Sequence, residues 1–468
     1  MNYLHTLTLL LIILTVPCYL RAQLITIDNE TPRRTVDGKI IDAHDGRVIQ
    51  FGERYYWYGT SYGNTSGFTT ANHYVCYSSD DLTSWTYEGK LLPDQAEGVY
   101  YRPHVIYHAP SRKFVLWYNW YPKLWEGQFG VATSDTPTGP FRVENPDVQM
   151  KHSEIGLGDF GLFVDDDGTA YLAYNTIQDH QVSIEKLSPD YLSSTMENGG
   201  FLAKHCEAGS MFKRNGMYYL LTDYTCCFCG EGSGARVYIS EDPLRGYEQR
   251  GNINRYPGVP QPHLTDGKSD RFGYTRLKDK EGIQITAPEP FDQVELTFAW
   301  KNYRSHCQPD NKDFRHPENI DPRFHFFSGE DSLLLDEPSN EHNFRNLTLR
   351  YRLPKGGTRS LRARLAAAEI PEYDLVEVRA LRYGRPIAQT EVYRAGWPKP
   401  PIIPAQQTHI MELQTATGTE YIWMGDLWGS RPDNVKGHDQ QYWSPPLRFR
   451  ADGSIERMEW TGSWSFER

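Results

Sequence analysis

The chain has 468 residues, of which 39% are hydrophobic and 23% charged; this excludes a disordered chain and predicts one large domain with a second beside it. The net charge of −11, with no basic run, argues against a nucleic-acid partner. Aromatic residues make up 13%, a share typical of carbohydrate clefts, where ring faces pack on sugars, and equally of strand-rich proteins.

Residues 1–22 have the features of a secretory signal peptide. The apolar run LTLLLIILTV at residues 7–16 is too short to span a bilayer, and Ala22 is a small residue suited to precede a cleavage site. We therefore expect a mature chain from residue 23 that is secreted or periplasmic and has no membrane span. A lipid anchor on Cys18 is the alternative, which we disfavour because Pro17 directly precedes it.

A short strand motif, rich in aromatic and β-branched residues, recurs along the chain. Its copies start at residues 55, 114, 170, 217 and 421, so they are separated by 59, 56, 47 and 204 residues. A second motif, a polar turn closed by an aromatic residue, follows in phase at residues 78–85, 134–141 and 240–247, with a degraded copy at 188–192. A spacing of about 50 residues is typical of one four-stranded blade. The fold class predicted is all-β, with a five-bladed β-propeller and no long helix.

The last spacing is about 150 residues too long for one blade, which predicts a domain inserted between blades four and five. Proline-rich segments at residues 256–262 and 397–401 bound it. Alternating runs at residues 293–300 and 375–381 predict half-buried strands and hence a β-sandwich-like domain. The domains are therefore expected at residues 23–259 (blades one to four), 260–400 (insert) and 401–468 (blade five and closure). Sugar binding and a purely structural role are both open for the insert.

Three cysteines are packed together at Cys226, Cys227 and Cys229. An exported chain can hold disulfides, and the second pair of ligands that a zinc site needs is missing nearby. We favour one or two local disulfides or buried thiols over a metal site. The connectivity stays open.

Three carboxylates lie just before strands of three different predicted blades: Asp45, Asp159 and Glu207. A propeller gathers its innermost strands around one axial pocket, so these side chains should converge there. Such a set suits inverting glycoside hydrolysis, in which a carboxylic acid protonates the leaving oxygen and a carboxylate opposite activates water. Any one of these residues taken alone is more simply a turn or capping residue.

The chain resembles glycoside hydrolase family 43, a family of five-bladed propellers, over residues 37–252 and 406–464. Within the family it is most similar to the exo-β-1,3-galactanase branch, on the motifs YRPHV at 101–105, QQT at 406–408, YIWMGDLW at 421–428 and YWSPPL at 442–447. The resemblance implies that Asp45 is the general base, Asp159 the residue that tunes the pKa and orients, and Glu207 the general acid. Three positions depart from that branch: Asp45 stands where it typically has Gly, Tyr101 replaces Glu, and Leu427 replaces Arg.

Further residues are candidates for contact with the sugar. Gln406 or Gln407 matches a glutamine that holds the attacking water in that branch. His44, next to Asp45, either points into the pocket, binds an axial ion or is a packed core residue. The other candidates, for most of which core packing is an equally good interpretation, are Tyr101, Arg102, Trp120, Trp125 and Trp443.

We therefore expect an exported, exo-acting, inverting glycoside hydrolase that removes a terminal galactose or arabinofuranose from a plant-type polysaccharide or glycan. A non-catalytic carbohydrate-binding propeller is the main alternative, because propellers host many functions. A third hypothesis, phosphorolysis, would need a basic phosphate pocket. No cofactor is expected to be required, and whether a structural calcium is bound is left open.

Overall fold

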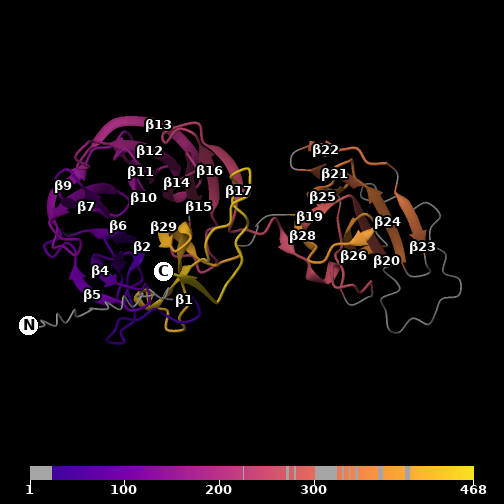
Figure 1. The fold of residues 1–468 in the computed structure, drawn as a ribbon, viewed down its shortest axis with the longest axis horizontal. Coiled ribbons are helices and arrows are strands. Elements are labelled where there is room, and N and C mark those ends of the chain that lie inside the picture. The colour runs from indigo at the N-terminus through magenta and orange to yellow at the C-terminus, as the bar shows by residue number, and fades with distance from the viewer. Residues whose placement is uncertain are drawn as a thin grey trace, which may run out of the picture.

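The computed structural model describes residues 24–468, apart from residues 225, 270–272, 279–280, 301–323, 329–330, 337, 343–345, 367–372 and 396–400. Two β domains lie side by side, the propeller in indigo, magenta and yellow and the second domain mainly in orange (Figure 1). Strands dominate the described residues, whose named helices are the single 3-10 turns η1 (Ser153–Ile155), η2 (Pro262–Leu264) and η4 (Lys436–His438). No described helix has the length and apolar character needed to cross a membrane.

Blades one to four follow one another along the chain, each a four-stranded antiparallel sheet whose strand order is the sequence order. Blade one is β2 (His44–Phe51), β3 (Arg54–Ser61), β4 (His73–Ser79) and β5 (Thr86–Lys90). Blade two is β6 (Val99–His108), β7 (Lys113–Tyr121), β8 (Gln128–Ser134) and β9 (Arg142–Val148). Blade three is β10 (Leu157–Val164), β11 (Ala170–Thr176), β12 (Gln181–Leu187) and β13 (Ser194–Lys204). Blade four is β14 (Glu207–Arg214), β15 (Met217–Asp223), β16 (Arg236–Ser240) and β17 (Glu248–Asn252).

Blade five comes from the C-terminal part of the chain and consists of β29 (Gln406–Thr415), β30 (Gly418–Leu427) and β31 (Gln440–Trp443). Its two faces pack against blade one and blade four in separate buried clusters, one around Trp57 and Trp443 and the other around Phe212 and Trp423. A further ribbon pairs β1 (Leu24–Asp28) with β32 (Ser463–Glu467) and packs into the cluster between blades one and five. The two ends of the described chain therefore close the ring together.

The predicted all-β propeller of five blades is confirmed, and the structure assigns a place to each motif. The recurrent aromatic motif is the second strand of every blade: β3, β7, β11, β15 and β30. The second strand is hydrogen-bonded on both sides and packed on both faces, which explains its run of large residues. The turn motif joins the third and fourth strands, and its closing aromatic Trp85 is fully buried between blades one and five.

The inserted domain consists of two sheets. One has the order β18 (Val259–Pro260), β28 (Glu391–Ala395), β19 (Gly282–Phe291), β25 (Thr358–Leu365), β21 (Phe324–Ser328), β22 (Asp331–Leu333). The other has the order β23 (Ser339–His342), β24 (Asn346–Arg352), β20 (Gln293–Trp300), β26 (Tyr373–Arg382), β27 (Arg385–Pro386). Alternate residues of both sheets, such as Ile283 and Leu361 from one and Leu296 and Val378 from the other, share one core. This is the expected β-sandwich-like insertion between blades four and five.

Candidate active site

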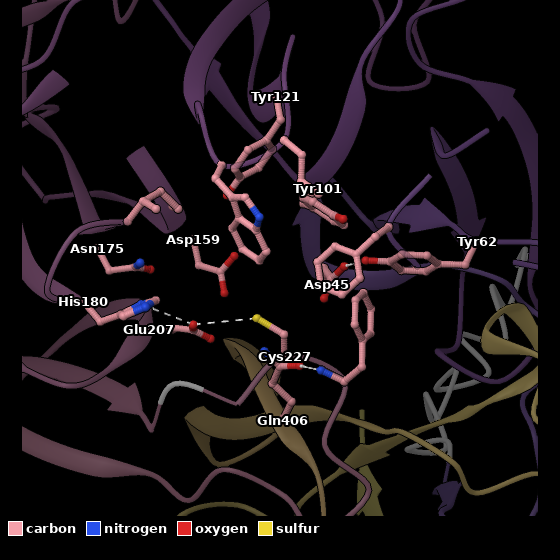
Figure 2. Close-up of a pocket in the computed structure, with 16 residues that line it drawn as sticks. Asp45, Tyr62, Tyr101, Tyr121, Asp159, Asn175, His180, Glu207, Cys227 and Gln406 are labelled. Carbon is pink, nitrogen blue, oxygen red and sulfur yellow. Dashed lines mark hydrogen bonds and ion pairs between the residues drawn. The ribbon is translucent and has the colours of Figure 1, made fainter. Parts of the chain in front are cut away.

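Each innermost strand of the propeller contributes a side chain to one pocket at the axis (Figure 2). The five are Asp45 of β2, Tyr101 of β6, Asp159 of β10, Glu207 of β14 and Gln406 of β29. All five strands carry a register shift close to these residues, where the ladder to the second strand is interrupted. Such bulges bend a strand and re-aim its side chains, which explains how strands that otherwise pack in the core present polar groups here. Asp45 itself has a positive φ of 55°.

Asp45, which lines the pocket, is held by two hydrogen bonds. Its carboxylate accepts the hydroxyl of Tyr62, and its backbone N–H donates to Asp426 Oδ2 at 2.7 Å. Burial raises the pKa of Asp45 to about 7, with help from the charges of Asp426 and Asp159, although Arg102 and the Tyr62 hydrogen bond oppose this. A carboxylate with such a pKa is ionised in part at neutral pH and is basic enough to take a proton from water.

Asp159 forms an ion pair with Arg102, whose Nε lies 2.9 Å from Asp159 Oδ1. The Arg102 side chain is 1% exposed, and its other nitrogens donate to the carbonyls of Gln407 and Thr408 at 3.3 and 3.4 Å. Burial lowers the pKa of Arg102, but the charges of Asp159 and Asp45 outweigh this and raise it, so the guanidinium stays positive. Arg102 lies behind the carboxylates and does not line the pocket, which corrects the expectation of a direct contact with the sugar.

Glu207 is 4% exposed, and its Oε1 lies 3.5 Å from His180 Nδ1 and 3.9 Å from Cys227 Sγ. Its buried Oε2 has no hydrogen-bond partner among the described residues. Burial raises the pKa of Glu207 well above its usual value, and the charges of Asp159 and Asp223 add to the effect. Its surroundings therefore favour the protonated form of Glu207, and Oε2 is free to donate the proton.

A further carboxylate, Asp223, lies behind Glu207 as its partner in the β14–β15 ladder. Asp223 is fully buried and accepts the hydroxyl of Ser233. Burial raises the pKa of Asp223 to about 7, and the charge of Asp159 contributes to this. Sequence reasoning missed this residue.

Several predicted sugar-contacting residues lie outside the pocket. His44 is fully buried behind Asp426, with Nδ1 3.2 Å from its Oδ1; burial lowers the pKa of His44, but Asp426 and Asp42 together raise it to about 9. Gln407 is buried and donates to the carbonyls of Ala208 and Leu221. These two residues position the strands around the pocket.

Two tryptophans are also corrected from candidate sugar contacts to core residues. Trp443 is fully buried beside Trp57 and Trp85 in the cluster between blades one and five. Trp120 stacks on Tyr100 and donates its indole N–H to the Pro146 carbonyl at 2.7 Å. Trp125, by contrast, is 57% exposed at the pocket rim.

The site residues that sequence reasoning missed come mainly from the ends of the second strands. Tyr62 follows β3, Tyr121 ends β7, Asn175 lies near the end of β11, Asp223 ends β15 and Asp426 lies near the end of β30. In an antiparallel hairpin the end of the second strand lies beside the start of the first. A usable signal was therefore present: polar residues just after each copy of the recurrent strand motif.

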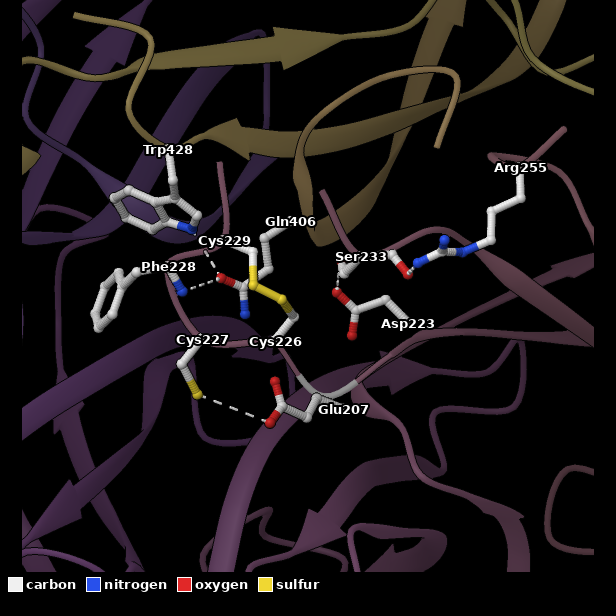
Figure 3. Close-up of a disulfide and its surroundings, with 10 residues drawn as sticks. All are labelled: Glu207, Asp223, Cys226, Cys227, Phe228, Cys229, Ser233, Arg255, Gln406 and Trp428. Carbon is white, nitrogen blue, oxygen red and sulfur yellow. Dashed lines mark hydrogen bonds between the residues drawn. A yellow bond between two sulfur atoms is a disulfide. The ribbon is translucent and has the colours of Figure 1, made fainter. Parts of the chain in front are cut away.

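The cysteine cluster forms a disulfide between Cys226 and Cys229, as Figure 3 shows, and Cys227 is a free thiol. Local disulfide formation was one of the two expectations for this cluster. Cys227 and Phe228, inside the loop that the disulfide closes, line the pocket. Among the described residues, no group of three or more His, Cys, Asp or Glu side chains is arranged to hold a metal ion.

Comparison with known proteins agrees with this geometry. Residues 40–260 match the family model of glycosyl hydrolases family 43. No match was found among curated proteins.

Among solved structures, an exo-β-1,3-galactanase from Clostridium thermocellum is similar with a TM-score of 0.55 and 20% identity, covering 94% of this chain and 67% of that chain. A GH43 β-1,3-galactosidase solved with galactodeoxynojirimycin has a TM-score of 0.54 and 20% identity, covering 94% of this chain and 100% of that one. A second GH43 β-1,3-galactosidase has a TM-score of 0.54 and 19% identity, and this chain spans 64% of its length. At these identities the likeness shows a shared fold.

Proposed function

We propose that this chain, whose residues 40–260 match the model of glycosyl hydrolases family 43, is a member of that family and an exo-acting enzyme that removes a terminal β-linked galactose with inversion. The observation that carries the proposal is the convergence of Asp45, Asp159 and Glu207, from three different blades, on one pocket. The pKa of Asp45 is raised to about 7, whereas that of Glu207 is raised well above its usual value. One carboxyl group that favours its protonated form and a second that is partly ionised at neutral pH suit the roles of general acid and general base.

In the proposed mechanism the buried Glu207 donates its proton from Oε2 to the glycosidic oxygen as the bond to the anomeric carbon breaks. Asp45 accepts a proton from a water molecule, which attacks the anomeric carbon from the opposite face. Asp159 holds no transferred proton in this scheme. It keeps Arg102 in place and contributes the negative charge that helps Glu207 remain protonated.

Terminal galactose is favoured over arabinofuranose because the solved structures with this fold include an exo-β-1,3-galactanase and two β-1,3-galactosidases. Their identity to this chain is 20% or less, so arabinofuranose remains an outcome of the test. Aromatic rings of Tyr62, Tyr101 and Tyr121 surround the pocket and suit the apolar face of a hexose. A plant-type β-1,3-galactan is the substrate class that we propose.

Export is also part of the proposal. It rests on the apolar run within residues 1–22, which lies outside the described residues. Cleavage after Ala22 would make Leu24, the first residue of β1, the second residue of the mature chain. The N-terminal sequence of the protein recovered from the medium or periplasm tests this.

The decisive experiment measures sugar release from 4-nitrophenyl β-galactoside, α-L-arabinofuranoside, β-xyloside and β-1,3-galacto-oligosaccharides. Wild type is compared with Glu207→Gln and with Glu231→Gln, an exposed acid in the loop after β15. We expect galactose release that falls about 10³-fold or more in Glu207→Gln and is retained in Glu231→Gln. NMR at early times should show the opposite anomer from the substrate.

The alternatives give different results. Equal turnover by wild type and Glu207→Gln would refute the proposed acid. Glycan binding without hydrolysis of any substrate would favour the carbohydrate-binding propeller, and a rate that depends on phosphate would favour phosphorolysis. Release of arabinose in place of galactose would keep the mechanism and change the substrate.

A further inference from the structure

A loop closed by the Cys226–Cys229 disulfide lies between β15 and β16 at the edge of the pocket (Figure 3). The backbone N–H of Cys229 donates to the Cys226 carbonyl at 3.4 Å, so the closed loop contains a tight turn. Its two middle residues, Cys227 and Phe228, face the pocket, and Phe228 has a positive φ of 58°. The disulfide thus restrains a turn that presents two side chains to the substrate space.

The loop belongs to blade four but reaches blade one. The ring centroid of Phe228 lies 5.5 Å from that of Tyr62 and 5.0 Å from that of Phe68, each nearly perpendicular. A Cβ atom added at Gly67 would lie 2.5 Å from Phe228 Cζ. The contact between the two loops is therefore too close for a single added methyl group.

Residues of blade five also hold this loop in place. Gln406 Oε1 accepts the backbone N–H of Phe228 at 3.3 Å and the indole N–H of Trp428 at 2.7 Å. The Trp428 ring packs 5.0 Å from Phe228, and Lys436 Nζ lies over both rings. Phe228 is thus held by groups from blades one and five.

The loop also sets the surroundings of the acid. Cys227 Sγ lies 3.9 Å from Glu207 Oε1, so a shift of this loop changes the space next to the carboxyl group. At the rim of the pocket, Leu124 and Trp125 of blade two are 41% and 57% exposed, and the Trp125 ring lies 5.8 Å from that of Phe68. The disulfide-closed loop is therefore part of the pocket wall, and the rim next to Phe68 is formed by solvent-exposed side chains of blade two.

We infer that the disulfide-closed loop of residues 226–229 is the specificity-determining wall of the pocket, which limits the space beside Glu207 to one unsubstituted chain-terminal sugar. The inference rests on the proposed function and extends it. Phe228 is the residue that excludes larger groups, and the Cys226–Cys229 bond is what keeps it in place. The rest of the substrate chain leaves past Leu124 and Trp125.

The test compares β-1,3-galactotriose with the same trisaccharide O-methylated on its terminal galactose. Enzymes assayed are wild type, Phe228→Ala, Phe228→Leu and the double variant Cys226→Ser/Cys229→Ser, each with and without dithiothreitol. The reagent cleaves the Sγ–Sγ bond to two thiols and is itself oxidised to its cyclic disulfide. Thermal unfolding of each variant, followed by circular dichroism, shows that it is folded at the assay temperature.

We expect wild type to prefer the unmodified triose strongly. The ratio of kcat/KM for the unmodified triose to that for the methylated one should fall about tenfold in Phe228→Ala, in the double variant and in reduced wild type. In each of these, KM for the unmodified triose should rise about tenfold. Phe228→Leu should retain most of the wild-type preference, because leucine keeps a large apolar side chain at this position. Dithiothreitol should not change the preference or the KM of the double variant.

The two proposals fail in different ways. An active wild type whose preference and KM are the same in every variant and under reduction would overturn the loop's role and leave the proposed function intact. A folded wild type that releases sugar from neither trisaccharide would overturn the proposed function for galactans, and this inference with it.

Discussion

Asp223 lies directly opposite Glu207 in the antiparallel ladder of β14 and β15, so a buried carboxyl group outside the pocket is paired in register with the one that lines it. Asp223 is bound by the hydroxyl of Ser233 and does not line the pocket itself. Its effect on chemistry must therefore act through Glu207. The negative charge of Asp223 raises the pKa of Glu207 and so favours the protonated form of the acid.

Replacing Asp223 by Asn should move the pH dependence of kcat/KM. The charge of Asp223 raises the pKa of Glu207, so its loss lowers that pKa. Glu207 acts in its protonated form, and the alkaline limb should therefore shift to lower pH. Asp165→Asn, at the β10–β11 turn, is the matched control and should leave the limb in place. An alkaline limb that is the same in wild type and Asp223→Asn would show that the two carboxyl groups are not coupled.

Tyr62→Phe should shift the opposite limb. The Tyr62 hydroxyl donates to the ionised form of Asp45 and thereby lowers its pKa, so removing it raises that pKa above its present value of about 7. Asp45 acts as an ionised base, and the acidic limb of kcat/KM should move to higher pH. Tyr101→Phe is the control, because its hydroxyl instead contacts the Gly67 carbonyl at 3.4 Å. Equal acidic limbs in both variants would contradict the assignment of Asp45 as base.

Arg102→Met should destabilise the fold as well as reduce activity. It removes the positive partner of Asp159 from a site where Arg102 is 1% exposed, and breaking a buried ion pair costs about 3–5 kcal/mol. Urea denaturation measures this change in the free energy of unfolding. The double variant Arg102→Met/Asp159→Asn should be more stable than Arg102→Met alone, because no carboxylate is then left without its partner. Additive losses would show that the ion pair does not stabilise the fold.

The stability of the protein should fall as pH rises from about 6.5 to about 9. Below that range the buried His104 and His409, whose pKa values burial lowers well below 6.5, contribute more stability as pH rises and so oppose the trend. Asp45 and Asp223 have pKa values raised from 3.8 to about 7, so the folded state holds protons that the unfolded chain has released. His44 keeps its proton up to about pH 9, against 6.5 unfolded, and extends the decline. Thermal melts across this range measure the trend.

Asp45→Asn provides the matched test of that trend. It removes a buried charge that forms as pH rises, so the variant should be more stable than wild type at pH 8 by about 1–3 kcal/mol and nearly equal at pH 4. Its activity should be about 10²–10⁴-fold lower. A variant less stable than wild type at pH 8 would contradict the raised pKa of Asp45.

The fold was predictable because its signals repeat. The second-strand motif occurs five times, and four of these copies are followed by the turn motif. The number of blades can therefore be predicted even if the assignment of one strand is wrong. The long gap before residue 421 marked the inserted sandwich for the same reason. A single copy of a motif such as residues 217–221 would not have distinguished a blade from any other hairpin.

The site was predictable only where its residues stand at the start of a blade. The spacing of the blade motifs was enough to place Asp45, Asp159 and Glu207. The same spacing could not assign Trp120 and Trp443 to the core or to the pocket. Strand residues alternate between the two faces of a sheet, and a β-bulge shifts that alternation by one residue. Phe228 contacts Tyr62 and Phe68, which lie about 160 residues earlier in the chain. This contact forms only when the five blades close into a propeller, so no local sequence pattern predicts it.

The pairing of β1 with β32 has a consequence for biosynthesis. The core between blades one and five includes Ile25 and Ile27 of β1 and Phe466 of β32. During synthesis β1 therefore stays unpaired, with its apolar side chains uncovered, until residues 463–467 have been made. The ring therefore closes last, after the sandwich has been produced in between. A chain that stops short of residue 463 has all the residues of its catalytic pocket but an open seam, and quality-control proteases can recognise such unfinished molecules by that exposed strand.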